Sequence, residues 1–172
     1  ILSLRGDTII SRDYRHDVPR ASMEVFFRKL KFWSEGESGE EAPPVFMVDG
    51  VTYLHVKAVG LLVVATTRQN ICPSLVLELL QRIVRVVKDY CGVLNEDALR
   101  KNFVLVYELL DEMVDFGLAQ GTSTEALKQY VFNEPVLLDN PQPTSSLFQS
   151  SKRMSSTAEQ KSVLQSEQSG KR

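Results

Sequence analysis

The sequence predicts an α+β domain in which helices flank a five-stranded antiparallel sheet, followed by a disordered polar tail. Three observations support this prediction. Short β-rich runs separated by turn residues occur at the N-terminus and across residues 45–65. Apolar residues recur at helical spacing after Pro19, after Pro73 and after Asn95. From Asn140 onward the chain is serine-rich and too polar to offset the entropy cost of folding.

The first element is expected to be a hairpin, with strands at Ile1–Leu4 and Thr8–Ile10 around the turn Arg5-Gly6-Asp7. The second strand is expected to continue through Ser11–Tyr14. An integrin-type use of Arg-Gly-Asp would need an extracellular loop, so the hairpin turn is the better interpretation. Because the sequence starts inside a strand-like pattern without Met, we interpret it as a fragment whose first strand has lost a few residues.

A helix is expected after Pro19, because apolar side chains at spacings of three and four form one broad aromatic face. That face comprises Met23, Phe26, Phe27, Leu30 and Trp33. Two interpretations remain open. The face packs against the sheet, or its edge, especially Phe32 and Trp33, reaches a partner. The solvated side is expected to carry Arg28, Lys29 and Lys31, and the acidic residues 34–44 form a loop.

The clearest hairpin joins Val45–Val48 to Val51–Val59 through Asp49-Gly50, a pair that suits a type I′ turn. One face of the second strand is mostly apolar and the other mixed, as in a half-buried antiparallel strand. Leu61–Ala65 is continuously apolar and predicts a central strand covered on both sides. His55 lacks companions at ligand spacing, so no metal site is expected there.

Three helices are expected in the second half. Pro73 suits the first turn of a helix that Gly92 ends. Asn95 can cap the next helix. The apolar face of that helix comprises Leu99, Phe103, Val106, Leu110 and Met113. After a break between Gly117 and Gly121, Thr122–Glu125 reads as a capping box for a short helix to about Phe132.

Four acidic residues lie on the same helix: Glu108, Asp111, Glu112 and Asp115. General acid–base catalysis would need a pocket that shifts their pKa values. A di-metal helix bundle would use Glu-x-x-His, and this helix contains no histidine. The interpretations left open are a solvated face and a contact surface for basic residues of another subunit.

Several classes of function are disfavoured by the whole sequence. A net charge of −2 over 172 residues, with a pI near 5.8, disfavours nucleic-acid binding. The sequence lacks a Gly-x-Ser-x-Gly elbow and a glycine-rich phosphate loop, so no enzyme activity and no cofactor are expected. No signal peptide or membrane-length apolar run is found, which predicts a cytosolic protein. Cys72 and Cys91 are both expected to be small buried hydrophobes in a reducing compartment.

Several motifs together resemble a known family: Arg12–Arg15, Phe26–Lys29, Asn102–Glu112, Asp115–Gly117 and Thr122–Glu125. They resemble the N-terminal longin domain of the medium (mu) subunits of clathrin-adaptor-type complexes, over about residues 1–137. Within the family, two stretches are most similar to adaptor protein complex 4: Cys72–Ile83 and Thr122–Glu125. Two others resemble a plant-like version of that subunit: Lys57–Leu61 and Asn133–Pro135. One departure is Leu118, since the family more often has an aromatic residue after that glycine.

The resemblance implies a longin (SNARE-like, profilin-like) domain over residues 1–137 and a flexible linker over residues 138–172. It implies a heterotetramer in which the mu subunit joins two large chains and a small sigma chain, with the longin domain against the large beta-type subunit. Such complexes sort cargo and coat vesicles at trans-Golgi network and endosomal membranes. Expected partner-binding residues are Phe27, Phe32, Trp33, Tyr53, Leu61, Glu108, Asp111 and Glu112.

The sequence is expected to stop in the linker, before the C-terminal mu homology domain that binds cargo in this family, so no cargo-binding residue is assigned. Ser155 and Ser156 follow Lys152-Arg153, a pattern that basophilic kinases accept, although an unmodified spacer fits equally well. The alternative function is a free regulatory longin domain of a SNARE or another trafficking factor. That alternative would need a long SNARE heptad after the domain, and the serine-rich tail lacks one.

Overall fold

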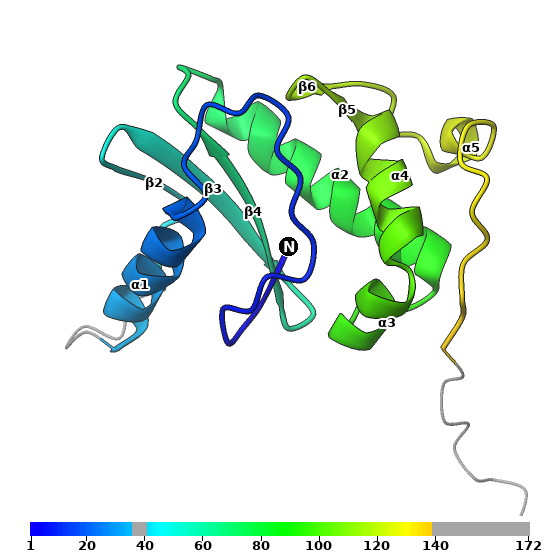
Figure 1. Cartoon of the computed structure of the whole chain (residues 1–172), viewed down its shortest axis with the longest axis horizontal. Helices are drawn as coiled ribbons and strands as arrows, with labels where there is room; N and C mark the ends of the chain where they lie inside the picture. Colours follow the sequence, from blue (N-terminus) through cyan, green and yellow to red (C-terminus); the bar gives the residue numbers. More distant parts are fainter. Residues whose placement is uncertain (36–40, 139–172) are drawn as a thin grey trace, which may run out of the picture. The chain divides into compact units, whose positions relative to one another are not determined.

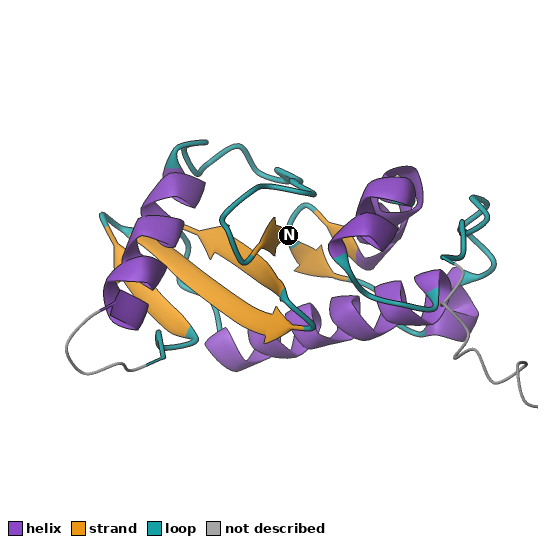
Figure 2. Ribbon diagram, turned by 90° about the horizontal axis from the view of Figure 1, so that it is seen from below, coloured by secondary structure: helices purple, strands orange, loops and turns teal. Residues whose placement is uncertain are grey.

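A four-stranded antiparallel sheet separates α1 (Ser22–Glu35) on one face from α2 (Pro73–Cys91) on the other (Figures 1 and 2). Its strands, in spatial order, are β1 (Leu2–Ser3), β4 (Leu61–Thr67), β3 (Val51–Ala58) and β2 (Val45–Val48). This computed structural model describes residues 1–35 and 41–138, which belong to one compact unit. The predicted α+β class is confirmed.

The β2–β3 hairpin forms as its turn residues predict. Asp49 and Gly50 both have positive φ, 51° and 72°, as a type I′ turn requires. The turn sets the register in which Val48 pairs with Val51. A second turn with two positive φ values, at Val59 and Gly60, joins β3 to β4.

In the described residues the sheet has four strands rather than five. The predicted turn at Arg5-Gly6-Asp7 does form, with the Gly6 N–H donating to the Ser3 carbonyl at 3.0 Å. The strand expected over Thr8–Ile10 is reduced to one isolated bridge between Thr8 and Leu2. Its continuation to Tyr14 was wrong, because the backbone of Ser11 is bonded to the Tyr107 hydroxyl and not to a strand.

Both faces of β3 are covered, so the prediction of a half-buried strand was wrong. Phe26 of α1 is fully buried and stacks on Phe46 and Tyr53, at centroid distances of 5.8 and 6.0 Å. This aromatic cluster covers the mixed face that was expected to meet solvent. The other face contributes Leu54 to a larger core between the sheet and α2.

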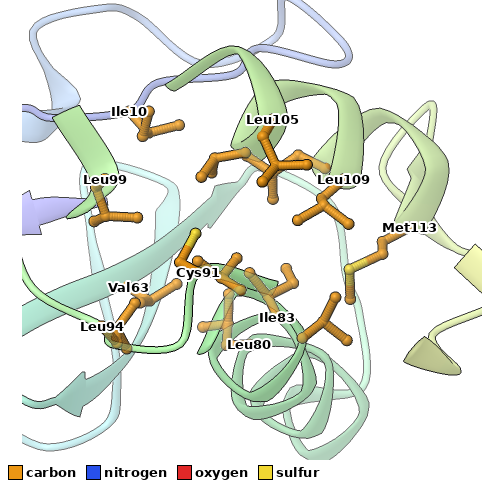
Figure 3. Packing of buried hydrophobic residues seen from close by; sticks show 14 of the residues in the cluster. Ile10, Val63, Leu80, Ile83, Cys91, Leu94, Leu99, Leu105, Leu109 and Met113 are labelled. Atoms are coloured by element: carbon orange, nitrogen blue, oxygen red, sulfur yellow. The ribbon is translucent and has the colours of Figure 1, made fainter. Parts of the chain in front are cut away.

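The larger core lies between the sheet, α2, α3 (Glu96–Lys101) and α4 (Phe103–Met113), as Figure 3 shows. Leu80 and Ile83 of α2 point toward Leu105 and Leu109 of α4. Pro73 begins α2 and Gly92, with φ of 75°, ends it, as predicted. Cys91 lies in this core, but Cys72 is exposed at the N-cap of α2, so the prediction that both cysteines are buried was wrong for Cys72.

The helix expected after Asn95 is divided in two at Asn102. Asn95 does cap α3, since its Oδ1 accepts from the Ala98 N–H at 2.7 Å. Asn102 leaves the helical conformation with φ −108° and ψ 24°. On α4, Val106, Leu110 and Met113 are buried in the core as predicted, together with Leu105 and Leu109. Phe103 was also expected there, but it is 53% exposed.

The segment after α4 contains a hairpin that was not predicted, β5 (Val114–Asp115) and β6 (Leu118–Ala119). It leads to α5 (Thr124–Leu127), which ends well before the expected Phe132. The capping box was also wrong. The Thr122 hydroxyl accepts from Arg82 at 3.2 Å, and no side chain caps α5.

Candidate partner-binding surfaces

The outward edge of α1 presents aromatic and basic side chains together. We call Phe27, Phe32 and Trp33, with the exposed residues Arg28, Lys29 and Lys31, the α1 surface. Phe32 is 69% exposed, whereas Phe27 and Trp33 are half-buried. The Lys29 and Lys31 ammonium groups lie 5.7 and 5.3 Å from the ring centroids of Phe32 and Phe27. Cations near aromatic faces make this a surface for both apolar and acidic contacts.

Two residues expected at the partner contact lie inside the domain. Tyr53 and Leu61 are each 1% exposed. Tyr53 stacks on Phe46 at a centroid distance of 5.2 Å, and Leu61 belongs to the larger core. Their side chains therefore offer no surface to a partner in this structure.

Two of the expected acidic contacts on α4 are already used within the chain. Both carboxylate oxygens of Asp111 bind the Arg12 guanidinium, at 2.7 Å to Nε and 2.8 Å to Nη2. Glu108 binds the segment after α5 through three hydrogen bonds. A bidentate Arg–carboxylate pair has fixed geometry, so Asp111 orients the N-terminal segment.

Two tyrosines complete this contact between the N-terminal segment and α4. The Tyr107 hydroxyl donates to the Ser11 carbonyl at 3.1 Å, and the Tyr14 hydroxyl donates to the Leu110 carbonyl at 3.1 Å. Burial raises the pKa of Tyr14 to about 12, with Asp111 adding to the rise and Arg12 opposing it. The motifs that carry the family resemblance thus meet one another, and much of the α4 pattern serves the fold.

Glu112 on α4 and Asp115 on β5 remain exposed beside a shallow hollow, so the prediction that Asp115 lies on the same helix was wrong. Its lining also includes Asp111, Gln120, Leu127 and Tyr130. The acidic side chains in this lining suit basic side chains of a partner. Within residues 1–35 and 41–138, no group of three potential metal ligands occurs. No helix of the described part is both long and apolar enough to cross a membrane. Ser155 and Ser156 lie outside the described residues.

Sequence reasoning missed the structural role of Asn102. Its side chain is 4% exposed and bonds both the Ala98 carbonyl and the backbone of Val136. An asparagine inside a helical apolar pattern was the available signal, since asparagine disfavours helix interiors and bonds nearby backbone. This signal could have predicted the break in the helix at Asn102, but not the hydrogen bonds between Asn102 and Val136.

His55 is a buried polar residue between aromatic rings. It is 8% exposed, with Phe26 and Phe46 edge-on at centroid distances of 5.4 and 6.2 Å. Its Nδ1 has no hydrogen-bond partner among the described residues. Burial lowers the pKa of His55 below its usual 6.5, and the Glu41 carboxylate partly opposes this effect.

We predict that His55 makes the domain less stable in acid. The folded-state pKa lies below the unfolded value of 6.5, so protonation favours the unfolded chain. The contribution of His55 is complete above pH 6.5 and is lost as the pH falls through 6.5 toward the folded-state pKa. Urea titrations at about pH 7.5 and about pH 5.5 should show a smaller acid loss of unfolding free energy in His55→Phe. Equal losses in both proteins would contradict the prediction.

No protein-family model matches the chain, but individual relatives do. The AP-4 complex subunit mu of Arabidopsis thaliana is 60% identical across 100% of this chain. The AP-4 complex subunit mu of Dictyostelium discoideum is 42% identical across 83% of this chain. The AP-4 complex subunit mu-1 of Bos taurus is 44% identical across 80% of this chain. The chain spans only 39%, 26% and 30% of the lengths of these three relatives.

Proposed function

Because the chain belongs to the family of adaptor-complex mu subunits, we propose that it is the assembly domain of the medium subunit of an AP-4-type complex. The observation that carries this proposal is the 60% identity with the Arabidopsis mu subunit, which extends over the whole chain. The match covers the whole domain, including the N-terminal segment and α4, so it supports a shared fold. In this proposal the chain functions by binding other subunits and has no enzymatic activity.

In this proposal the medium subunit joins two large subunits and a small sigma subunit. The assembled complex sorts membrane cargo into vesicles on the cytoplasmic side of trans-Golgi network and endosomal membranes. The domain binds the large beta-type subunit and reaches the membrane only through the complex. Its fold is a longin domain, in which α1 covers one face of the sheet, and the Thr8–Ile10 segment is the fifth strand reduced to a bridge.

The proposed contact with the large subunit is the α1 surface, with Glu112 and Asp115 as a second, acidic contact. Phe32 is the expected anchor, because a large aromatic side chain that is 69% exposed gains most from burial on a partner. The exposed cations around it indicate an acidic rim on the partner. Interfaces of permanent complexes typically bury more than about 2,000 Å² in total, so both contacts are needed.

Co-expression with the large beta-type subunit tests the proposal. We expect the two chains to co-purify and to remain together in high salt, since the contact is centred on an aromatic residue. Phe32→Ala should weaken binding by about 30-fold, the size typical of an interface hot spot. Leu75→Ala is the matched control, because Leu75 is 64% exposed on α2, away from the α1 surface. A soluble chain that stays monomeric beside the large subunit would overturn the proposal.

A further inference from the structure

The segment after α5 is fixed to the domain although it forms neither helix nor strand. We call residues 132–137 the strap; it is drawn in yellow in Figure 1, between α5 and the end of the described chain. Two side chains hold it, one on α4 and one at the N-cap of α4. Each bonds the strap's backbone at a different place.

The first anchor is the Glu108 carboxylate. The backbone N–H groups of Phe132 and Asn133 donate to its two oxygens at 3.1 and 3.2 Å, and the Asn133 side-chain amide donates at 2.7 Å. Burial would raise the pKa of Glu108, but these three bonds outweigh it and lower the pKa. The carboxylate is therefore the charged acceptor of strong hydrogen bonds.

The second anchor is the Asn102 side chain, which pairs with Val136 as a neighbouring strand would. Its Oδ1 accepts from the Val136 N–H at 2.7 Å, and its Nδ2 donates to the Val136 carbonyl at 3.0 Å. The same Nδ2 also donates to the Ala98 carbonyl, so this buried amide is well satisfied while the strap is bound. Loss of the strap would leave one of its groups dependent on water.

The strap contributes little to the hydrophobic core. Phe132, Val136 and Leu137 are 84%, 53% and 65% exposed, whereas Val131, just before the strap, is buried in the core. Segments with few buried apolar contacts open at lower free energy than the domain that carries them. The strap is held by polar anchors, and the rest of the domain by its core.

We propose that the strap is a latch, a single unit that detaches from Glu108 and Asn102 while the domain stays folded. Detachment frees six residues, so the point from which the following chain departs can move by about 20 Å at about 3.3 Å per extended residue. The latch thus sets the reach of whatever follows residue 138. This inference concerns the chain itself and does not depend on the proposed binding to a large subunit.

Hydrogen exchange followed by mass spectrometry on the whole chain tests the latch. Val136→Pro removes the N–H group that donates to Asn102, without changing a core residue. Leu137→Pro is its matched control, because within residues 1–35 and 41–138 the Leu137 N–H makes no hydrogen bond. Glu108→Gln weakens the other anchor, and Glu112→Gln is the control at an exposed acid one turn along α4. We expect Val136→Pro and Glu108→Gln each to speed exchange at Phe132 and Asn133 by about tenfold or more, and both controls to leave it unchanged.

Protection in α2 and α4 decides between a latch and a part of the core. Unchanged protection there in Val136→Pro, together with fast exchange in the strap, supports the latch. If the same variant also speeds exchange in α2 and α4, the strap is part of the core and the proposal fails. It fails equally if Val136→Pro leaves exchange at Phe132 and Asn133 unchanged, because the two anchors then do not act on one unit.

Discussion

Replacing Phe26 by alanine should lower the free energy of unfolding by about 3–5 kcal/mol, the range measured for fully buried aromatic residues. Phe26 is 0% exposed and stacks on Phe46 and Tyr53, so truncation leaves a cavity between α1 and the sheet. The rings around that cavity also lose their stacking partner, which contributes beyond the buried area. Urea unfolding followed by circular dichroism measures the change.

Phe32→Ala on the same helix is the control for this result. Phe32 is 69% exposed, so its truncation should change the unfolding free energy by less than about 0.5 kcal/mol. The pair separates two roles of one residue type: Phe26 stabilises the domain, and Phe32 is available to a partner. Similar destabilisation by both substitutions would mean that α1 does not pack as described.

Gly6→Ala should destabilise the domain by about 2–5 kcal/mol, from two separate causes. Gly6 has φ of 96°, a conformation that costs an L-residue about 1–2 kcal/mol. A Cβ at this position would also lie 2.6 Å from Cε1 of the Phe27 ring, so the ring or the turn must shift. Overpacking of this kind typically costs about 1–3 kcal/mol. Thermal unfolding of the variant measures the sum.

Two other glycines separate the causes. Gly50→Ala tests backbone strain alone, since φ is 72° and a Cβ there would meet nothing within 4 Å. Gly121→Ala tests neither, because its backbone is not in the left-handed region and the space is open. We expect the loss of stability to be largest for Gly6, intermediate for Gly50 and near zero for Gly121. A Gly6 variant no less stable than the Gly50 variant would refute the contact with Phe27.

The sequence predicted those turns and helix ends that depend only on residues close together in the chain. Asp49-Gly50 specifies its turn because both residues tolerate positive φ, and Pro73 and Gly92 mark the ends of α2. The covered face of β3 could not be predicted, because residue alternation does not say whether a helix will lie over a mixed face. Asn102, which lies at the break between α3 and α4, bonds a residue 34 positions away, and no spacing pattern contains such a contact.

In the candidate site, too, local spacing predicted the position of some residues but not the contacts of residues whose partners are distant in the sequence. The spacing placed Phe32 at the edge of the apolar face of α1, and the structure leaves its side chain 69% exposed. Glu108 and Asp111 were expected on a free acidic face, but their partners lie 24 and 99 residues away in sequence. The resemblance marked the N-terminal and α4 motifs as a group, and the structure supplies the physical reason, since they contact each other.

The 19 residues of α2 extend for about 28 Å at about 1.5 Å per residue, beneath the sheet and beneath α4 (Figure 2). This one continuous helix packs against both the sheet and α4. The sheet and α4 therefore cannot move relative to each other as rigid bodies unless α2 bends.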